Sequence, residues 1–176
     1  CTAFLGPILG AAADYSGGKK RYMSGFLVVA VVFTACLYMV QQGDWLMAVV
    51  FYVLASIGNA GANIFYDSLL PHVARPDEID RVSAKGYALG YLGGGILLLI
   101  NLVWYMQPTL FGLPDANTAV RVAFLSVAVW WVVFSIPIFR HVPEPPRSAP
   151  PGWHGNALKE GLGRLGQTFA AIRQYR

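Results

Sequence analysis

The sequence predicts an all-α integral membrane protein, and three observations lead to this fold class. Charged residues make up only 12% of the chain, about half of the roughly 25% that is usual in soluble domains. Four apolar segments each have the length of roughly 20 residues that a helix needs to cross a hydrocarbon core of about 30 Å. All but one of the 13 lysines and arginines fall on one side of the resulting topology. The lipid bilayer is therefore the predicted partner of most of the chain.

The four predicted membrane spans carry no charge in their interiors. They cover residues 22–40, 46–66, 86–106 and 120–139. Residues 1–13 form a fifth apolar run, which ends at Asp14 and is too short to span, so we expect it to be a helix that is truncated by the start of the chain. A secretory signal peptide is not indicated, because no basic segment precedes this run. The chain should therefore contain about five transmembrane helices.

The loops between these spans differ sharply in charge. Loops 14–21, 67–85 and 140–176 contain every lysine and arginine except Arg121, whereas the opposite loops contain only acidic charges, Asp44 and Asp115. Because cytoplasmic loops of membrane proteins are enriched in lysine and arginine, we expect the first set to be cytoplasmic, in a bacterial inner membrane. The same rule explains the pI of about 9.2, so a nucleic-acid partner is not needed to account for it.

The composition changes after the last span. Residues 140–155 are rich in proline, which does not sustain a helix and favours an extended connector. Beyond this linker, residues 156–176 place apolar side chains three or four apart, which predicts an amphipathic helix on the cytoplasmic side: Leu158, Leu162, Leu165, Phe169 and Ile172. Such a helix fits either a loop helix between two halves of a transporter or a helix that lies on an anionic inner leaflet.

No motif for catalysis, metal binding or cofactor binding is present in the sequence. Cys1 and Cys36 both lie in predicted apolar helices, and neither has a metal-site spacing to the three histidines. There is no G-x-S-x-G or P-loop sequence, and the acidic residues lie mainly at the predicted membrane edges. We therefore expect no enzyme activity, no metal and no cofactor.

One predicted span carries a polar stripe. Tyr52, Ser56, Asn59, Asn63 and Tyr66 recur at offsets of four and three, so they share one face of a helix. An amide that faces lipid loses its hydrogen bonds at a cost of several kcal/mol, so the stripe should face protein or water. Two interpretations remain: the amides bond to neighbouring helices, or Tyr52, Ser56, Asn59 and Asn63 line a substrate cavity.

Two stretches resemble a known family of transporters. The sequence GAAADYSGGKK resembles the first cytoplasmic loop of the major facilitator superfamily, through the residues Gly10, Asp14, Gly17, Lys19 and Lys20. The sequence FYDSLLPHVARPDEIDRVSAKGYALGYLGGG, residues 65–95, more narrowly resembles the autophagy-related vacuolar effluxer-like family within that superfamily.

The resemblance implies a partial major facilitator fold that comprises the second to sixth helices and the central loop. It also implies a secondary active transporter that moves a small organic solute, with amino acids as the expected class, by alternating access together with a missing C-terminal half. A non-transporting membrane scaffold with the same fold is the alternative. In the family, the acid of the first loop helps to latch the two halves on the cytoplasmic side. Asp14 also follows a helix that runs towards the cytoplasm, where the helix dipole disfavours a carboxylate, so we expect a positive partner from Lys19, Lys20 or Arg21 at the start of the next helix, or from Arg81 in the following loop. The alternative is that Asp14 is a solvated loop charge.

The predicted span 86–106 is rich in glycine. Gly86, Gly90 and Gly94 lie four residues apart, a spacing that allows the backbone of another helix to approach closely. We therefore expect these three glycines to pack against a neighbouring helix.

Overall fold

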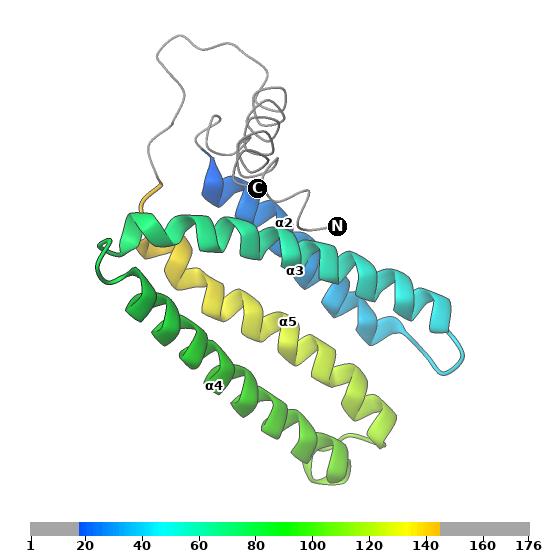
Figure 1. Ribbon diagram of the computed structural model, residues 1–176. Coiled ribbons are helices and arrows are strands. Elements are labelled where there is room, and N and C mark those ends of the chain that lie inside the picture. Colours follow the sequence, from blue (N-terminus) through cyan, green and yellow to red (C-terminus); the bar gives the residue numbers. More distant parts are fainter. Residues whose placement is uncertain (1–17, 145–176) are drawn as a thin grey trace, which may run out of the picture.

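The computed structural model describes residues 18–144 (Figure 1). The expected truncated helix at 1–13, the loop residues Gly10, Asp14 and Gly17, the linker beyond residue 144 and the amphipathic helix at 156–176 lie outside the described residues. The predictions made for those segments therefore stay predictions.

The described part of the chain is all-helical and contains no strand. Its elements are, in order, α2 (Lys19–Cys36), the 3-10 turn η1 (Leu37–Met39), α3 (Trp45–Val73), α4 (Ile79–Met106), the 3-10 turn η2 (Pro108–Phe111) and α5 (Ala116–His141). Four of these segments are long and apolar enough to cross a membrane: Lys19–Met39, Trp45–Val73, Ile79–Met106 and Ala116–His141. The prediction of an all-α membrane protein is thereby confirmed.

Two helices are considerably longer than the spans expected from hydropathy. The span predicted at 46–66 corresponds to α3, which continues to Val73, and the span predicted at 86–106 corresponds to α4, which begins at Ile79. The loop expected at 67–85 therefore shrinks to residues 74–78. Hydropathy locates only the apolar part of a helix, whereas the backbone ladder continues into polar sequence as long as its hydrogen bonds can form.

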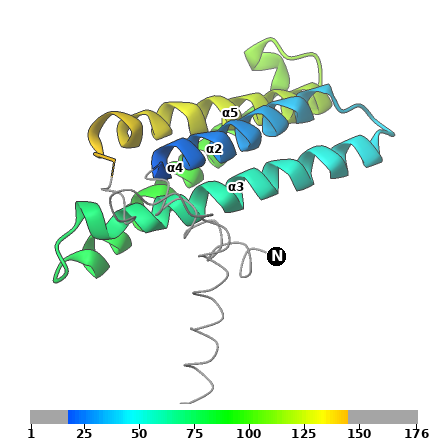
Figure 2. The ribbon, with the colours of Figure 1, turned by 90° about the horizontal axis from the view of Figure 1, so that it is seen from above.

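The helices lie side by side in the order α3, α2, α5 and α4, with each helix antiparallel to its neighbour. Figure 2 shows α2 between α3 and α5, and Figure 1 shows α4 beside α5. The start of α2, the end of α3 and the end of α5 meet in one buried cluster, in which Met23, Phe65 and Leu69 form the core. We call this end of the bundle the His141 end, after the last residue of α5.

The closest helix contact joins α2 and α3, and it depends on two glycines. A Cβ atom added at Gly58 would lie 2.5 Å from the backbone nitrogen of Ala30 and 2.8 Å from its Cα, and one added at Gly61 would overlap the ring of Phe26. The aromatic ring of Phe65, which is fully buried, stacks on Tyr22 with their centroids 5.6 Å apart. Small residues therefore let these two helices approach, and large rings fill the space beside them.

The antiparallel pair α2 and α5 is joined by a cation at each end. At the His141 end, Lys20 Nζ donates to the carbonyl oxygens of Phe139 and Val142, at 2.8 and 2.7 Å. At the other end, Arg121 Nε donates to the carbonyl oxygen of Tyr38 at 2.6 Å. Each cation thus binds carbonyls at the C-terminal end of the facing helix, where the helix dipole favours positive charge.

Helix α4 is held mainly by α5. Ser126 Oγ donates to Asn101 Oδ1 at 2.9 Å, and the Trp130 ring lies within 3.8 Å of where a Cβ of Gly93 would be. By contrast, α4 makes few contacts with α3, although both helices border the same side of the bundle. The space between them forms the cleft described next.

Candidate functional site

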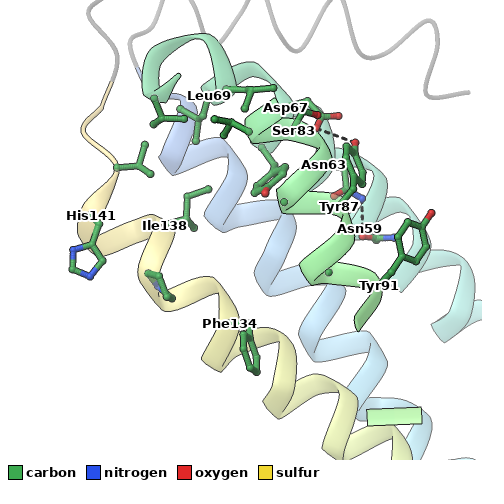
Figure 3. A pocket seen from close by; sticks show the side chains of 18 residues that line it. Asn59, Asn63, Asp67, Leu69, Ser83, Tyr87, Tyr91, Phe134, Ile138 and His141 are labelled. Atoms are coloured by element: carbon green, nitrogen blue, oxygen red, sulfur yellow. Dashed lines mark hydrogen bonds between the residues drawn. The ribbon is translucent and has the colours of Figure 1, made fainter. Parts of the chain in front are cut away.

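A cleft of about 1030 Å³ lies between α3 and α4, with α5 on its third side (Figure 3). It runs along α3 from Asn59 to Val73 and ends beside His141 of α5 and the following residue, Val142. We call it the α3–α4 cleft. It exists because α3 and α4 both extend well past their apolar segments towards the His141 end, while their helix bodies stay apart.

Two rows of polar side chains face each other across this cleft. Asn59, Asn63 and Asp67 follow one another at intervals of four residues along α3, which places them on one face of the helix. On α4 the same spacing aligns three further lining residues: Ser83, Tyr87 and Tyr91. Figure 3 shows both rows and the two hydrogen bonds that they make.

The polar rows are hydrogen-bonded both along α3 and across the cleft. Asn63 Nδ2 donates to Asn59 Oδ1 at 3.0 Å, one turn away on the same helix. The phenol of Tyr87 donates to Asp67 Oδ1 at 3.4 Å and connects α4 to α3. The carboxylate of Asp67 and the amides of the two asparagines therefore offer both donors and acceptors to a molecule in the cleft.

The third side of the cleft is apolar. Phe134, Pro137 and Ile138 of α5 face it, together with Leu69 and Leu70 of α3. A cavity with mostly apolar walls and a few converging polar groups is typical of sites that bind small molecules. Within residues 18–144, no three histidine, cysteine, aspartate or glutamate side chains come together as a metal site would require. The arrangement is thus suited to binding and orienting an amphipathic solute.

The predicted cavity residues divide into two groups. Asn59 and Asn63 line the cleft, whereas Tyr52 and Ser56 do not line it and lie exposed nearer the start of α3. The predicted stripe is therefore continuous on the helix, but only its second half borders this cavity.

The predicted packing of Gly86, Gly90 and Gly94 against a neighbouring helix has no counterpart within residues 18–144 and stays a prediction. Gly86 and Gly90 line the cleft, and a Cβ added at Gly86 would lie 3.6 Å from the Tyr66 hydroxyl. Gly90 and Gly94 have no described atom within 4 Å of such a Cβ. Within residues 18–144, close backbone approach is found instead at Gly58, because packing depends on the partner helix as well as on the spacing of small residues.

Several cleft residues were not predicted from the sequence. The hydropathy pattern places Asp67 in the loop 67–85, and it gives no indication that Tyr87 or Tyr91 borders a cavity. The signal was present: Asp67 lies four residues after Asn63 and continues the same row. Hydropathy ends the span at residue 66, whereas α3 continues to Val73 and so carries Asp67 on the same face as Asn63.

Of the residues predicted for the latch between the two halves, the three within the described part of the chain, Lys19, Lys20 and Arg81, lie at the His141 end. Lys19 and Lys20 form the first turn of α2, where Lys19 is buried and Lys20 binds the end of α5. Arg81 is exposed in the first turn of α4. Lys19 and Lys20 thus begin α2, and Lys20 has carbonyl partners on α5 and the residue after it.

The sequence was also compared with known proteins. The family model described as vacuole effluxer Atg22 like matches residues 1–176. An uncharacterized MFS-type transporter, YxiO of Bacillus subtilis (strain 168), is 38% identical over 99% of this chain, which covers 40% of that protein. Autophagy-related protein 22 of Yarrowia lipolytica is 38% identical over 40% of the chain, which corresponds to 11% of the relative.

Autophagy-related protein 22 of Pichia angusta is 24% identical over 86% of the chain, or 33% of its own length. No solved structure matches. The family match over the whole chain agrees with the resemblance of residues 65–95 and with four membrane-spanning helices in the described part. The chain therefore belongs to the vacuole effluxer Atg22-like family of membrane proteins.

Proposed function

We propose that this chain forms part of a secondary active transporter, and that the α3–α4 cleft belongs to the path of a small organic solute. The observation that carries the proposal is the pair of facing polar rows, which begin within the apolar segment of α3 at Asn59 and Asn63 and continue past it to Asp67. Polar groups within a membrane are normally satisfied by protein or water. Here they border a cavity of about 1030 Å³, which is large enough for a small organic molecule.

Alternating access is proposed as the mechanism. In transporters of this kind a central site is reached from either side when two halves of the protein rock against each other. The chain spans 40% of the length of the Bacillus relative, so the rest of the path would come from helices beyond it. A non-transporting scaffold is the alternative, which a dry, fully packed polar stripe would favour; within residues 18–144, Asn59 and Asn63 instead border the cleft.

Amino acids are the solute class that the family resemblance implies, and the cleft offers groups that suit them. The carboxylate of Asp67 can accept a hydrogen bond from an ammonium group, and the amides of Asn59 and Asn63 can donate to a carboxylate. The apolar wall on α5, formed by Phe134 and Ile138, would then contact the side chain of the solute.

We also propose that the His141 end faces the cytoplasm, in a bacterial inner membrane. The described cations support this orientation: the first turn of α2, the residues around the α3–α4 loop and the end of α5 all lie at that end. Cysteines at Gly43 and Asn117 should then react with an impermeant reagent outside intact cells, whereas a cysteine at Arg75 should not. The reverse labelling pattern would overturn the orientation.

The transport proposal is tested with the full-length protein reconstituted into proteoliposomes. A panel of radiolabelled amino acids should include at least one that is taken up saturably. The substitution Asn63→Leu, which keeps the size of the side chain but removes its amide, should reduce that uptake at least tenfold. Ser56→Ala on the same helix lies outside the cleft and should leave it unchanged. Equal effects of the two substitutions, or no saturable uptake of any organic solute, would contradict the proposal.

A further inference from the structure

A second, separate cavity of about 520 Å³ lies between α2 and α5. Its walls are Leu27, Val28, Val31 and Val32 of α2, together with Val132 and Ile136 of α5. None of these residues lines the α3–α4 cleft. We call this cavity the α2–α5 groove. Val28 and Val132 are 59% and 45% exposed, so the described helices leave the groove open to its surroundings.

The few hydroxyl groups in the groove are already bonded to their own helices. Ser24 Oγ donates to the carbonyl oxygen of Arg21 at 2.8 Å, and Ser135 Oγ donates to that of Trp131 at 2.7 Å. Such hydroxyl-to-carbonyl bonds within a helix remove the need for an external polar partner. The groove surface is therefore suited to hydrocarbon and not to a polar solute.

The length of the groove matches one leaflet of a bilayer. Its lining runs from Ser24 to Val32 on α2 and from Arg140 back to Val132 on α5. The eight steps between the first and last of these residues, at a rise of about 1.5 Å each, span roughly 12 Å, close to half of a hydrocarbon core of about 30 Å. The groove thus extends from the His141 end to near the middle of the membrane.

Positively charged side chains lie where this apolar groove reaches the His141 end. Arg140, in the last turn of α5, is the only charged residue among those that line it. Arg21 is exposed and lies three residues before Ser24, so it is on the groove face of α2, one turn nearer the membrane surface. The acidic Glu144 lies at the same end, where its carboxylate accepts from the backbone N–H of Lys20.

We propose that the α2–α5 groove binds one anionic phospholipid from the leaflet at the His141 end. An acyl chain would lie along the valines, and the phosphate would pair with Arg140 and Arg21. Basic pockets between transmembrane helices bind anionic headgroups in this way. The bound lipid would fill the space between two helices that are otherwise joined by cations at their ends, so it would stabilise the pair.

The test uses the full-length protein in nanodiscs that contain a phosphatidylglycerol with a photoreactive diazirine on its acyl chain. After irradiation, mass spectrometry should locate labelled peptides in α2 and α5, including the segments around Val28 and Ile136. The double substitution R21Q/R140Q should lower this labelling at least fivefold. The control R75Q, which removes an exposed cation from the α3–α4 loop, should leave it unchanged.

A second variant tests the groove without altering charge. Ile136→Trp should fill the groove and reduce labelling of α2, whereas Leu98→Trp, at a side chain that is 68% exposed and outside the groove, should not. Three outcomes would each overturn the proposal. The first is labelling that is spread evenly over the exposed face of α4, and the second is equal labelling by a phosphatidylcholine probe. The third is no labelling of the groove because protein covers it. Nanodiscs expose both leaflets to the probe, so the result does not depend on the proposed orientation or on transport.

Discussion

The ammonium group of Lys20 lies 2.7 Å from the carbonyl oxygen of Val142 and joins the first turn of α2 to the end of α5. In return, Glu144 accepts a hydrogen bond from the backbone N–H of Lys20, at the N-terminal end of α2. Each helix terminus therefore receives the charge that its dipole favours. At the opposite end of the pair, the Arg121 guanidinium binds the carbonyl of Tyr38 and lies 4.7 Å above the centroid of its ring.

Replacing Lys20 should loosen the pairing of α2 and α5. In Lys20→Met the carbonyl oxygens of Phe139 and Val142 lose a charged donor, and hydrogen bonds to charged groups contribute about 1.5–3 kcal/mol each. We expect a lower thermal unfolding midpoint for the full-length protein, measured by the loss of its monodisperse elution peak after heating. Lys85→Met is the matched control, because Lys85 is exposed on α4. Equal midpoints for the two variants would show that Lys20 serves only to set topology.

The contact between α2 and α3 should be intolerant of a single added methyl group. In Gly58→Ala the new Cβ would meet backbone atoms of Ala30 and Phe26, which cannot rotate away, so the helices must separate. We expect a marked loss of folded protein, in the range of about 1–3 kcal/mol found for overpacked cores. Gly25→Ala, whose Cβ would enter open space, should be tolerated. Normal stability of Gly58→Ala would contradict the close packing.

The start of α5 should show a dependence on pH. Asp115 accepts a hydrogen bond from the backbone N–H of Thr118 at 2.6 Å, which lowers the pKa of its carboxyl below the ordinary value. A carboxyl with a lowered folded pKa stabilises the folded state above its unfolded pKa of about 3.9. This contribution is lost as the pH falls through the folded pKa.

The corresponding measurement compares unfolding midpoints of the wild type, Asp115→Asn and Asp115→Ala between pH 7 and pH 3. Asn keeps an oxygen acceptor that does not titrate, so its midpoint relative to Asp115→Ala should stay constant across this range. The advantage of the wild type over Asp115→Ala should shrink towards pH 3. An advantage that does not change with pH would exclude the carboxylate as the origin of the capping effect.

The sequence was sufficient to predict the four membrane spans and the polar stripe, because apolar length and helical spacing are local properties. Asn59 and Asn63 could be placed on one face from their interval of four alone. The pairing of Tyr87 with Asp67 could not be predicted, since it depends on how far α3 and α4 continue beyond the hydrocarbon and on how the two helices face each other.

The dependence on neighbouring helices also explains why the close contact at Gly58 and the binding of Lys20 to the end of α5 could not be predicted from the sequence. Gly58 and Gly90 both lie in glycine-containing apolar helices, but only Gly58 meets another backbone in the described part of the chain. Whether a glycine is a contact point is decided by the neighbouring helix, which the local sequence does not encode. Likewise, Lys20 carries the charge expected from topology, yet its binding to the end of α5 results from the antiparallel packing of segments more than 100 residues apart.

Cysteine accessibility at Asn63 tests the central claim, that the α3–α4 cleft is part of a solute path, most directly. In a full-length protein whose Cys1 and Cys36 are replaced by alanine, Asn63→Cys should react with a small charged thiol reagent, because only a hydrated thiol ionises and reacts readily. Leu98→Cys, which is exposed outside the cleft, should face lipid and stay unreactive. A transported solute should slow the reaction at Asn63→Cys, whereas an unreactive Asn63→Cys in an active transporter would contradict the account.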